Sequence, residues 1–168
     1  MMRGALFLFS ALNETDIGWM AHAGSIRRFA AGDALIRAGE TIDQLLVLLD
    51  GVVRVETAEG RVIALRREGE CLGEVSLVDT LPTSSSVIAT EPVRALHLPG
   101  DRLRTKIATD SGFATRFWHG IAILLANRLR EVTSGGAAPP LDDIMLNDVA
   151  RSGDRFLLLR DYTRSSAV

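Results

Sequence analysis

The sequence predicts a mainly β domain with flanking α-helices, folded as an antiparallel β-barrel or jelly roll (a double-stranded β-helix) with an N-terminal helix and C-terminal helices. Between residues 26 and 98, short β-rich runs are separated by glycine-bearing turns about every ten residues. Asp50-Gly51 lies between two apolar runs, and this pattern is the strongest short-range signal of a hairpin. After Pro99-Gly100 the spacing of apolar residues becomes helical.

Each expected element follows from its local pattern. Residues 10–24 combine apolar positions with Asn13 and Asp16, whose polar side chains suit the start of a short helix. Val53 and Val55 alternate with charged residues, as in a half-buried antiparallel strand. The expected strands are 26–30, 34–37, 45–49, 52–57, 61–65, 87–89 and 93–98.

Two helices are expected after the strands, over residues 101–108 and 113–132. The second is long and amphipathic, because its apolar residues recur at spacings of three and four. These residues are Phe113, Phe117, Ile121, Leu124, Leu125, Leu129 and Val132. Residues 135–140 contain two glycines and two prolines and are expected to form a linker. One or two short helices are expected in the tail, residues 141–168.

The domain organisation follows from these elements. A chain of 168 residues suits one domain with a small appendage. We expect an N-terminal helical segment in residues 1–25, the β-barrel in residues 26–100, and C-terminal helices of the same domain in residues 101–134. The linker and the short helical tail, residues 141–168, complete the chain.

Composition argues against several classes of protein. The net charge of −2 gives no attraction to nucleic acid or to an anionic membrane. No apolar stretch approaches the ~20 residues of a membrane span. Cys71 is the single cysteine, which excludes an internal disulfide and fits a reducing compartment. We therefore expect a cytoplasmic chain with no membrane partner.

Catalytic patterns are missing from the sequence. His22, His97 and His119 stand apart, in an expected helix end, a strand and a helix, so they do not predict a metal site. No Gly-x-Ser-x-Gly nucleophile motif occurs. We expect neither enzymatic activity nor a metal or cofactor.

The order of helix, β-barrel and paired helices resembles the cyclic nucleotide-binding domain. This family includes catabolite-activator-type regulators, regulatory subunits of protein kinase A, and nucleotide-gated channels. The resemblance covers roughly residues 8–134. The segments that carry it are 28–36, Gly39-Glu40, 45–49 with Gly51, Glu68-Gly69-Glu70, Gly73-Glu74-Val75-Ser76-Leu77, and Ala126-Asn127-Arg128-Leu129.

This resemblance implies that residues 73–86 form a phosphate-binding cassette, with cAMP or cGMP as the candidate ligand. The implied ligand-binding residues are Gly73, Glu74, Val75, Ser76, Thr83, Ser84 and Ser85. A glycine lets the backbone approach a ligand, and Glu74 would open a short helix whose free N–H groups can face a phosphate. The alternative is that Glu74 only caps this helix and Gly73 only serves a turn.

The cassette departs from the family at one position. Thr83 stands where relatives usually carry an arginine, and no arginine lies between Arg67 and Arg94. The loss of one charge-assisted contact corresponds to about 1.5–3 kcal/mol of binding free energy. Three interpretations stay open for residues 83–86: a polar loop, a neutral anion-binding nest for a weaker or different ligand, or a vestigial pocket on a barrel retained for protein contacts.

Two functions follow. The chain is either a regulatory module that senses a cyclic nucleotide or related anion, or a ligand-independent docking module. Residues 135–168 are few for the helix-turn-helix of bacterial relatives and balance arginines against aspartates, so direct DNA binding is not expected. A homodimer or another protein is the expected partner, through the long helix and Trp118. The tail could cover its own barrel or contact that partner.

Overall fold

A computed structural model describes residues 5–135 and 143–165, which form two compact units. Ala23–Leu103 make up the first, called here the sheet unit. The second, called here the helical unit, combines the residues before Ala23 with those after Leu103. The sheet unit is therefore an insertion within the sequence of the helical unit.

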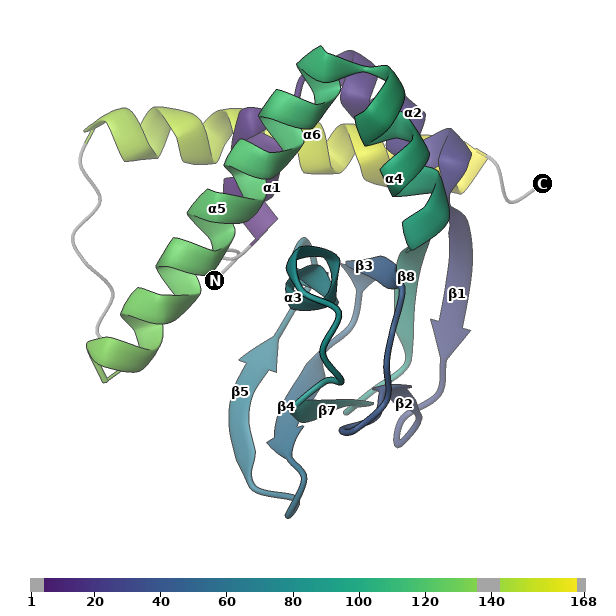
Figure 1. The fold of residues 1–168 in the computed structure, drawn as a ribbon, viewed down its shortest axis with the longest axis vertical. Helices are drawn as coiled ribbons and strands as arrows, with labels where there is room; N and C mark the ends of the chain where they lie inside the picture. Colours follow the sequence, from purple (N-terminus) through teal and green to yellow (C-terminus); the bar gives the residue numbers. More distant parts are fainter. Residues whose placement is uncertain (1–4, 136–142, 166–168) are drawn as a thin grey trace. The chain divides into compact units, whose positions relative to one another are not determined.

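The sheet unit contains eight strands in two antiparallel four-stranded sheets (Figure 1). One sheet has the order β1-β8-β3-β6, and the other has the order β2-β7-β4-β5. The strands are β1 (Ser25–Phe29), β2 (Ala34–Ile36), β3 (Gln44–Asp50), β4 (Val53–Thr57), β5 (Val62–Arg66), β6 (Cys71–Leu72), β7 (Ser85–Ala89) and β8 (Val93–Pro99).

Apolar residues from both sheets form one core between them. β3 and β8 and their neighbour β6 contribute Leu46, Leu48, Leu72, Val93 and Ala95. The facing sheet contributes Leu35, Ile36, Val53, Val87 and Ala89. Successive side chains of a strand point to opposite faces. Because the five residues from Leu45 to Leu49 are all fully buried, β3 is covered on both of its faces.

This architecture confirms the predicted jelly roll with flanking helices and all seven expected strands. It corrects two details. Neither sheet closes into a barrel. Asp50-Gly51 is not a hairpin turn, because β3 and the following β4 belong to different sheets. The adjacent hairpin is instead formed by β4 and β5, which pair across the turn at Glu59-Gly60.

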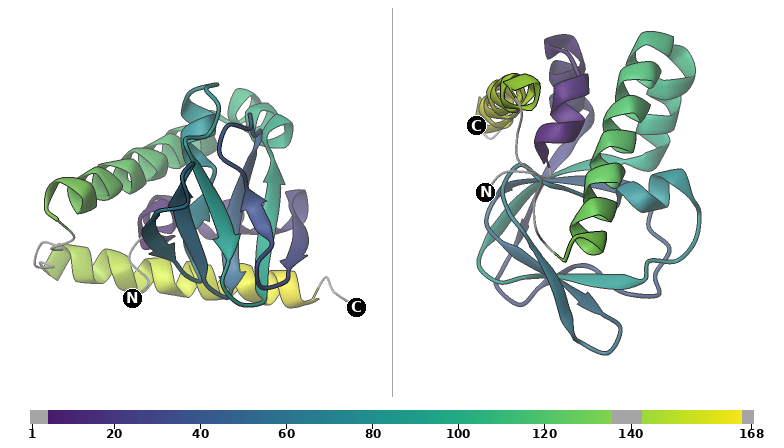
Figure 2. Two further views of the ribbon diagram at one scale, coloured as in Figure 1. Left: turned by 90° about the horizontal axis from the view of Figure 1, so that it is seen from below. Right: turned by 90° about the vertical axis from the view of Figure 1, so that its left-hand side faces the viewer.

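The helical unit is built from both ends of the sequence. Its helices are α1 (Ala5–Ala11), α2 (Glu14–Ala23), the end of α4 (Gly100–Thr109), α5 (Ser111–Thr133) and α6 (Asp143–Ser165). α1 packs against both α5 and α6, between which it lies in Figures 1 and 2. The buried apolar residues include Leu8, Phe9, Leu12, Ile17, Met20, Phe113, Phe117, Ile121, Leu124, Phe156 and Leu159.

Two expectations about helices change. The short helix expected within residues 10–24 is α2, which Asn13 and Asp16 start as predicted, but a separate helix, α1, precedes it. The tail forms one helix of 23 residues, longer than the short helices expected there. Most of the expected linker, residues 136–140, lies outside the described residues.

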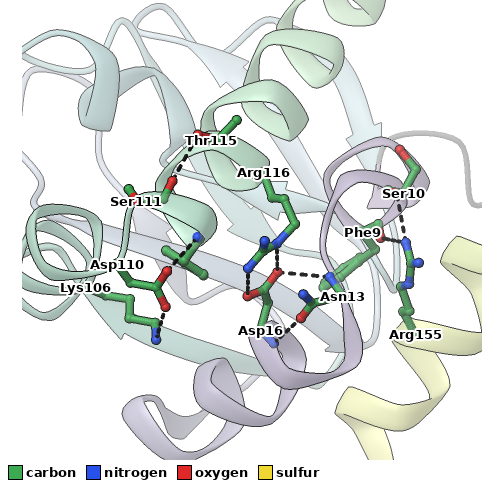
Figure 3. A network of polar contacts seen from close by, with 11 residues as sticks. Phe9, Ser10, Asn13, Asp16, Lys106, Asp110, Ser111, Thr115, Arg116 and Arg155 are labelled. Carbon is green, nitrogen blue, oxygen red and sulfur yellow. Dashed lines mark hydrogen bonds and ion pairs between the residues drawn. The ribbon is translucent and has the colours of Figure 1, made fainter.

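A network of polar contacts joins the helices of the helical unit (Figure 3). Asn13 and Asp16 form a reciprocal capping box at α2, in which each side chain accepts from the other's backbone N–H at 2.9 Å. Asp110 caps α5 by accepting from the N–H of Phe113, and Lys106 donates to the same carboxylate. These two contacts lower the pKa of the Asp110 carboxyl below its ordinary value, with the Phe113 N–H as the larger cause.

Arginines fix two further chain segments. In the helical unit, Arg155 of α6 donates from Nη1 to the carbonyl oxygens of Phe9 and Ser10, 2.8 and 2.7 Å away, at the end of α1. In the sheet unit, Arg102 Nη1 donates to the carbonyl oxygen of Ala23 at 3.0 Å. The chain therefore enters and leaves the sheet unit at neighbouring points, since Ala23 is its first residue and Arg102 lies next to its last.

Candidate functional site

Gly73 begins the candidate cassette, at the point where β6 gives way to a short helix, α3 (Glu74–Val78). Its φ of 86° lies in the left-handed region, which favours glycine. A Cβ at this position would stand 2.5 Å from the carbonyl oxygen of Gln44 and 3.3 Å from Cδ1 of Ile42. Both the backbone angle and the missing side chain are therefore required here.

Glu74 is the first residue of α3 and is only 4% exposed. The structure thus gives the short helix expected from the sequence, although it ends at Val78 and Asp79 is its C-cap. A carboxylate at the first turn of a helix interacts favourably with the helix dipole. Glu74 is not the cap of this helix, as the alternative interpretation had it, because the N-cap is Gly73. Acidic side chains are seldom this buried, so Glu74 differs from the exposed acidic residues of the chain.

The segment after α3 turns back toward β7. The Asp79 side chain accepts from the N–H of Leu81 at 3.1 Å, which closes a tight turn. Val75, Val78 and Leu81 are exposed, and Ser76 is half-buried. Ser84 is exposed, while Ser85 opens β7 opposite Thr57 of β4.

Thr83, at the position of the family's arginine, has all of its donor groups engaged by another segment. Its hydroxyl donates to the carbonyl oxygen of Arg37 at 2.8 Å, and its N–H donates to that of Glu40 at 2.9 Å. Its own carbonyl oxygen accepts from the N–H of Gly39 at 2.7 Å. In this arrangement the Thr83 hydroxyl offers a ligand its lone pairs and no donor.

The connection between β2 and β3 is therefore part of the site, which the sequence did not reveal. Residues 37–40 hold Thr83, and Ala38 N–H also donates to the Ser86 hydroxyl oxygen at 2.9 Å. Farther along, Ile42 of the same connection and Gln44, the first residue of β3, lie next to Gly73. Gly39-Glu40 is visible in the sequence as a turn, but its partners lie more than 40 residues away.

A buried carboxylate also fixes the segment that leads into the cassette. Glu70, which is 5% exposed, accepts from Arg66 Nη1 at 3.2 Å and from the N–H of Arg67 at 2.7 Å. Leu48 N–H donates to the Glu70 carbonyl oxygen at 2.9 Å. These contacts join residues 66–70 to β3 just before β6 and Gly73.

His97 is the one histidine of the sheet unit. It pairs with Ser25 and Leu46 on the neighbouring strands β1 and β3. Burial lowers its pKa below the ordinary value of 6.5, and the nearby positive charge of Arg27 lowers it further. Among the described residues, no group of three or more His, Cys, Asp or Glu side chains is arranged to hold a metal ion.

Comparison with known proteins assigns the chain to a family. The family model described as "Cyclic nucleotide-binding domain" matches residues 26–110, which include both sheets and the cassette. The chain belongs to the cyclic nucleotide-binding domain family. This confirms the resemblance seen in the sequence.

Three comparisons show what kinds of protein this chain is similar to. The chain is 28% identical over 126 residues to Glutaminase 2 of Bradyrhizobium diazoefficiens, a match that covers 75% of this chain and 20% of that protein. It is 27% identical over 125 residues to the CRP-like cAMP-activated global transcriptional regulator of Mycobacterium tuberculosis, covering 72% of this chain and 52% of that protein. The crystal structure of a cyclic nucleotide-binding domain from Methylobacillus flagellatus matches with a TM-score of 0.71 at 21% identity, covering 84% of this chain and 86% of that one.

The chain thus spans about half or less of the two curated relatives, and one fifth of the glutaminase. Along the described part of the chain, no helix has both the length and the apolar character needed to cross a membrane.

Proposed function

We propose that this chain is a non-catalytic, cytoplasmic regulatory module that senses a cyclic nucleotide or a related anionic ligand through residues 73–86, a cassette without the usual arginine. The observation that carries the proposal is the geometry of Gly73 and Glu74 inside the matched family region. Gly73 has a left-handed φ and no room for a side chain, and the Glu74 that follows is buried.

The cassette residues suit different parts of such a ligand. Glu74 can accept hydrogen bonds from a ribose hydroxyl. The exposed Ser84 and the neighbouring Ser85 carry hydroxyls that can donate to phosphate oxygens. The mycobacterial relative is cAMP-activated by name, which makes cAMP the first ligand to test.

Thr83 sets the expected affinity. An arginine at this position would add a charge-assisted contact worth about 1.5–3 kcal/mol, which is roughly a 10- to 100-fold difference in dissociation constant. The Thr83 hydroxyl is occupied by the carbonyl oxygen of Arg37 and does not replace that contact. We therefore propose weak binding of cAMP or cGMP, or preference for a ligand whose phosphate needs less positive charge from the protein.

Calorimetry with cAMP and cGMP tests the proposal on the wild type, on Thr83→Arg and on the control Thr90→Arg. Thr90 is matched because its exposed hydroxyl also donates to a backbone carbonyl oxygen, that of Val52, at 2.8 Å. We expect weak binding by the wild type, at least ~10-fold tighter binding by Thr83→Arg, and wild-type affinity for Thr90→Arg. Absence of binding in both the wild type and Thr83→Arg would reject cAMP and cGMP as ligands and would point to a vestigial pocket.

The second candidate is a degenerate domain that acts as a ligand-independent docking or assembly module. It is favoured by one observation in the helical unit. α5 carries a second apolar stripe besides its buried one, at positions 118, 122, 125, 129 and 132. The spacing alternates between four and three residues, which is the heptad spacing of paired helices. Leu129 is 64% and Val132 is 80% exposed, and Trp118 begins the stripe.

A second copy of this chain is the partner that we propose for the stripe, because the same helix in two copies offers the same heptad seam to each. Light scattering tests this with Leu129→Glu and Val132→Glu, using Leu157→Glu of α6 as a control at an exposed apolar residue outside the stripe. We expect a dimer for the wild type and the control, and a monomer for the two stripe variants. A monomeric wild type would contradict the proposal.

A further inference from the structure

Two arginines that are far apart in sequence lie side by side on neighbouring strands of the sheet unit. Arg28 of β1 is directly opposite Arg94 of β8 in the antiparallel register. We propose that these two side chains form a binding site for a phosphate group, free or esterified, on the outer face of the β1-β8-β3-β6 sheet. β1 and β6 are the two edges of this sheet, and the cassette follows β6, so this site is distinct from the cassette and does not rest on its proposed function.

The register places both arginines on the face of the sheet that points away from the core. Directly opposite residues of an antiparallel pair share a face, and neighbours along a strand point to opposite faces. Val93 and Ala95, on either side of Arg94, belong to the core between the two sheets. Arg94 and Arg28 therefore point outward. Arg27, which is opposite Ala95, points to the other face.

Arg94 has more hydrogen-bond donors than its surroundings satisfy. Its side chain is only 16% exposed, and Nε and Nη2 are buried without a hydrogen-bond partner among the described residues. Nη2 lies 2.8 Å from Oδ2 of Asp50 on β3, but this ion pair does not have the angles of a hydrogen bond. Buried donors without an acceptor cost free energy, so a further acceptor at Arg94 would stabilise the folded chain.

Arg28 adds a second positive charge at the same place. Its side chain is exposed and forms no ion pair within the described part of the chain. Like charges directly opposite each other on neighbouring strands destabilise a sheet. Asp50 compensates one of the two charges, and it does so from the β3 side of Arg94, away from β1. One net positive charge therefore remains between β1 and β8.

A phosphate group suits this arrangement in both charge and geometry. A guanidinium is a planar fork of N–H donors that can bind two phosphate oxygens side by side. A tetrahedral phosphate has enough oxygens to accept from two such forks at once, whereas the two oxygens of a carboxylate are used by one. Binding would reduce the repulsion between Arg28 and Arg94 and supply acceptors to Arg94. Because the Asp50 carboxylate repels an anion, we expect the affinity to be modest.

Thermal unfolding in inorganic phosphate tests the site, with sodium chloride at equal ionic strength as the reference, because salt alone screens the two charges. We expect phosphate at about five times its dissociation constant to raise the Tm of the wild type by about 2–4 °C relative to chloride. Arg28→Gln should abolish this rise. Arg27→Gln is the matched control and should keep it, since Arg27 is the exposed neighbour on the same strand that points to the other face.

Asp50→Asn should have the opposite effect. It removes the carboxylate that competes for Arg94, at nearly constant side-chain volume, and should enlarge the phosphate-dependent rise in Tm. An unchanged rise in this variant would overturn the role of Arg94. The whole site is rejected by an equal rise in chloride, by no rise at all, or by a rise that persists in Arg28→Gln and so places the phosphate elsewhere, for example at the cassette. Calorimetry with cAMP reports on the cassette alone, so either proposal can fail while the other stands.

Discussion

Asp16 of α2 and Arg116 of α5 form a two-point ion pair between residues that are 100 positions apart in sequence, with Nε and Nη2 of Arg116 at 2.6 and 2.9 Å from the carboxylate oxygens of Asp16 (Figure 3). The Asp16 side chain is 3% exposed and is also part of the capping box of α2. The hydrogen bonds that Arg116 donates to Asp16 raise the pKa of Arg116, so its guanidinium stays charged.

Removal of Arg116 should therefore destabilise the protein strongly. Arg116→Ala leaves the buried Asp16 carboxylate without its charged partner, which costs about 2–4 kcal/mol of unfolding free energy. Urea denaturation measures this cost. Arg151→Ala, at an exposed position of α6, serves as the control and should change stability by less than ~0.5 kcal/mol. An equal, small effect of both substitutions would mean that the ion pair between Asp16 and Arg116 contributes little to stability.

Gly120 should resist substitution because α1 crosses α5 at this residue. A Cβ there would lie 2.9 Å from both the Leu8 carbonyl oxygen and Leu8 Cδ1, so the helix backbones would have to separate. We expect Gly120→Ala to destabilise the protein by about 1–3 kcal/mol, whereas Gly18→Ala in α2 should stabilise it by about 0.5–1 kcal/mol. No atom lies within 4 Å of a Cβ at Gly18. Thermal unfolding should show a lower Tm for Gly120→Ala and a higher Tm for Gly18→Ala if the two helices cross as closely as described.

Two glycines of the sheet unit have the same backbone conformation but different surroundings. They therefore distinguish the cost of a left-handed φ from the cost of steric overlap. Gly73 and Gly60 have φ values of 86° and 84°, but only Gly73 has neighbours within 4 Å of a Cβ. Gly60→Ala should cost about 1–2 kcal/mol for the left-handed backbone alone, and Gly73→Ala should cost more. Equal losses of unfolding free energy for the two variants in chemical denaturation would show that the backbone at Gln44 moves to make room for the added methyl group.

His97 should make stability depend on pH. Its pKa in the folded state is below the ordinary value of 6.5, so the unfolded chain binds more protons in the window between the two values. Stability is therefore fully present above pH 6.5 and decreases as the pH falls below it. His97→Gln should flatten this part of the profile in urea denaturation between pH 7.5 and pH 5.5. A profile identical to that of the wild type would assign the slope to other groups.

Local patterns predicted the strands well because each strand carries its own alternation or apolar run. The strand β6 was not predicted, since Cys71 and Leu72 are too few for any alternation to appear. The predicted hairpin at Asp50-Gly51 failed for a different reason. A turn signal describes the local chain and not the sheet that the next strand joins. Gly51 is needed here for a close approach, because a Cβ at this position would lie 2.6 Å from the Pro92 carbonyl oxygen.

The candidate site was predictable only where its residues are adjacent in sequence. Gly73 and Glu74 occupy the expected turn and helix start. The engagement of Thr83 was not visible, because its hydroxyl partner, Arg37, lies 46 residues earlier. The roles of Val75, Ser76, Ser84 and Ser85 in binding, the absence of DNA contact and the cytoplasmic location stay predictions.

The insertion of the sheet unit between α2 and α4 has a consequence for biosynthesis. α1 has no charged residue, and its partners in α5 and α6 follow some 100 residues later in the chain. At about 5–20 residues per second, a ribosome needs roughly 5–20 seconds to translate that interval. During this time the nascent α1 has no cognate surface to bury against, and it is the segment of this chain that we expect chaperones to shield first.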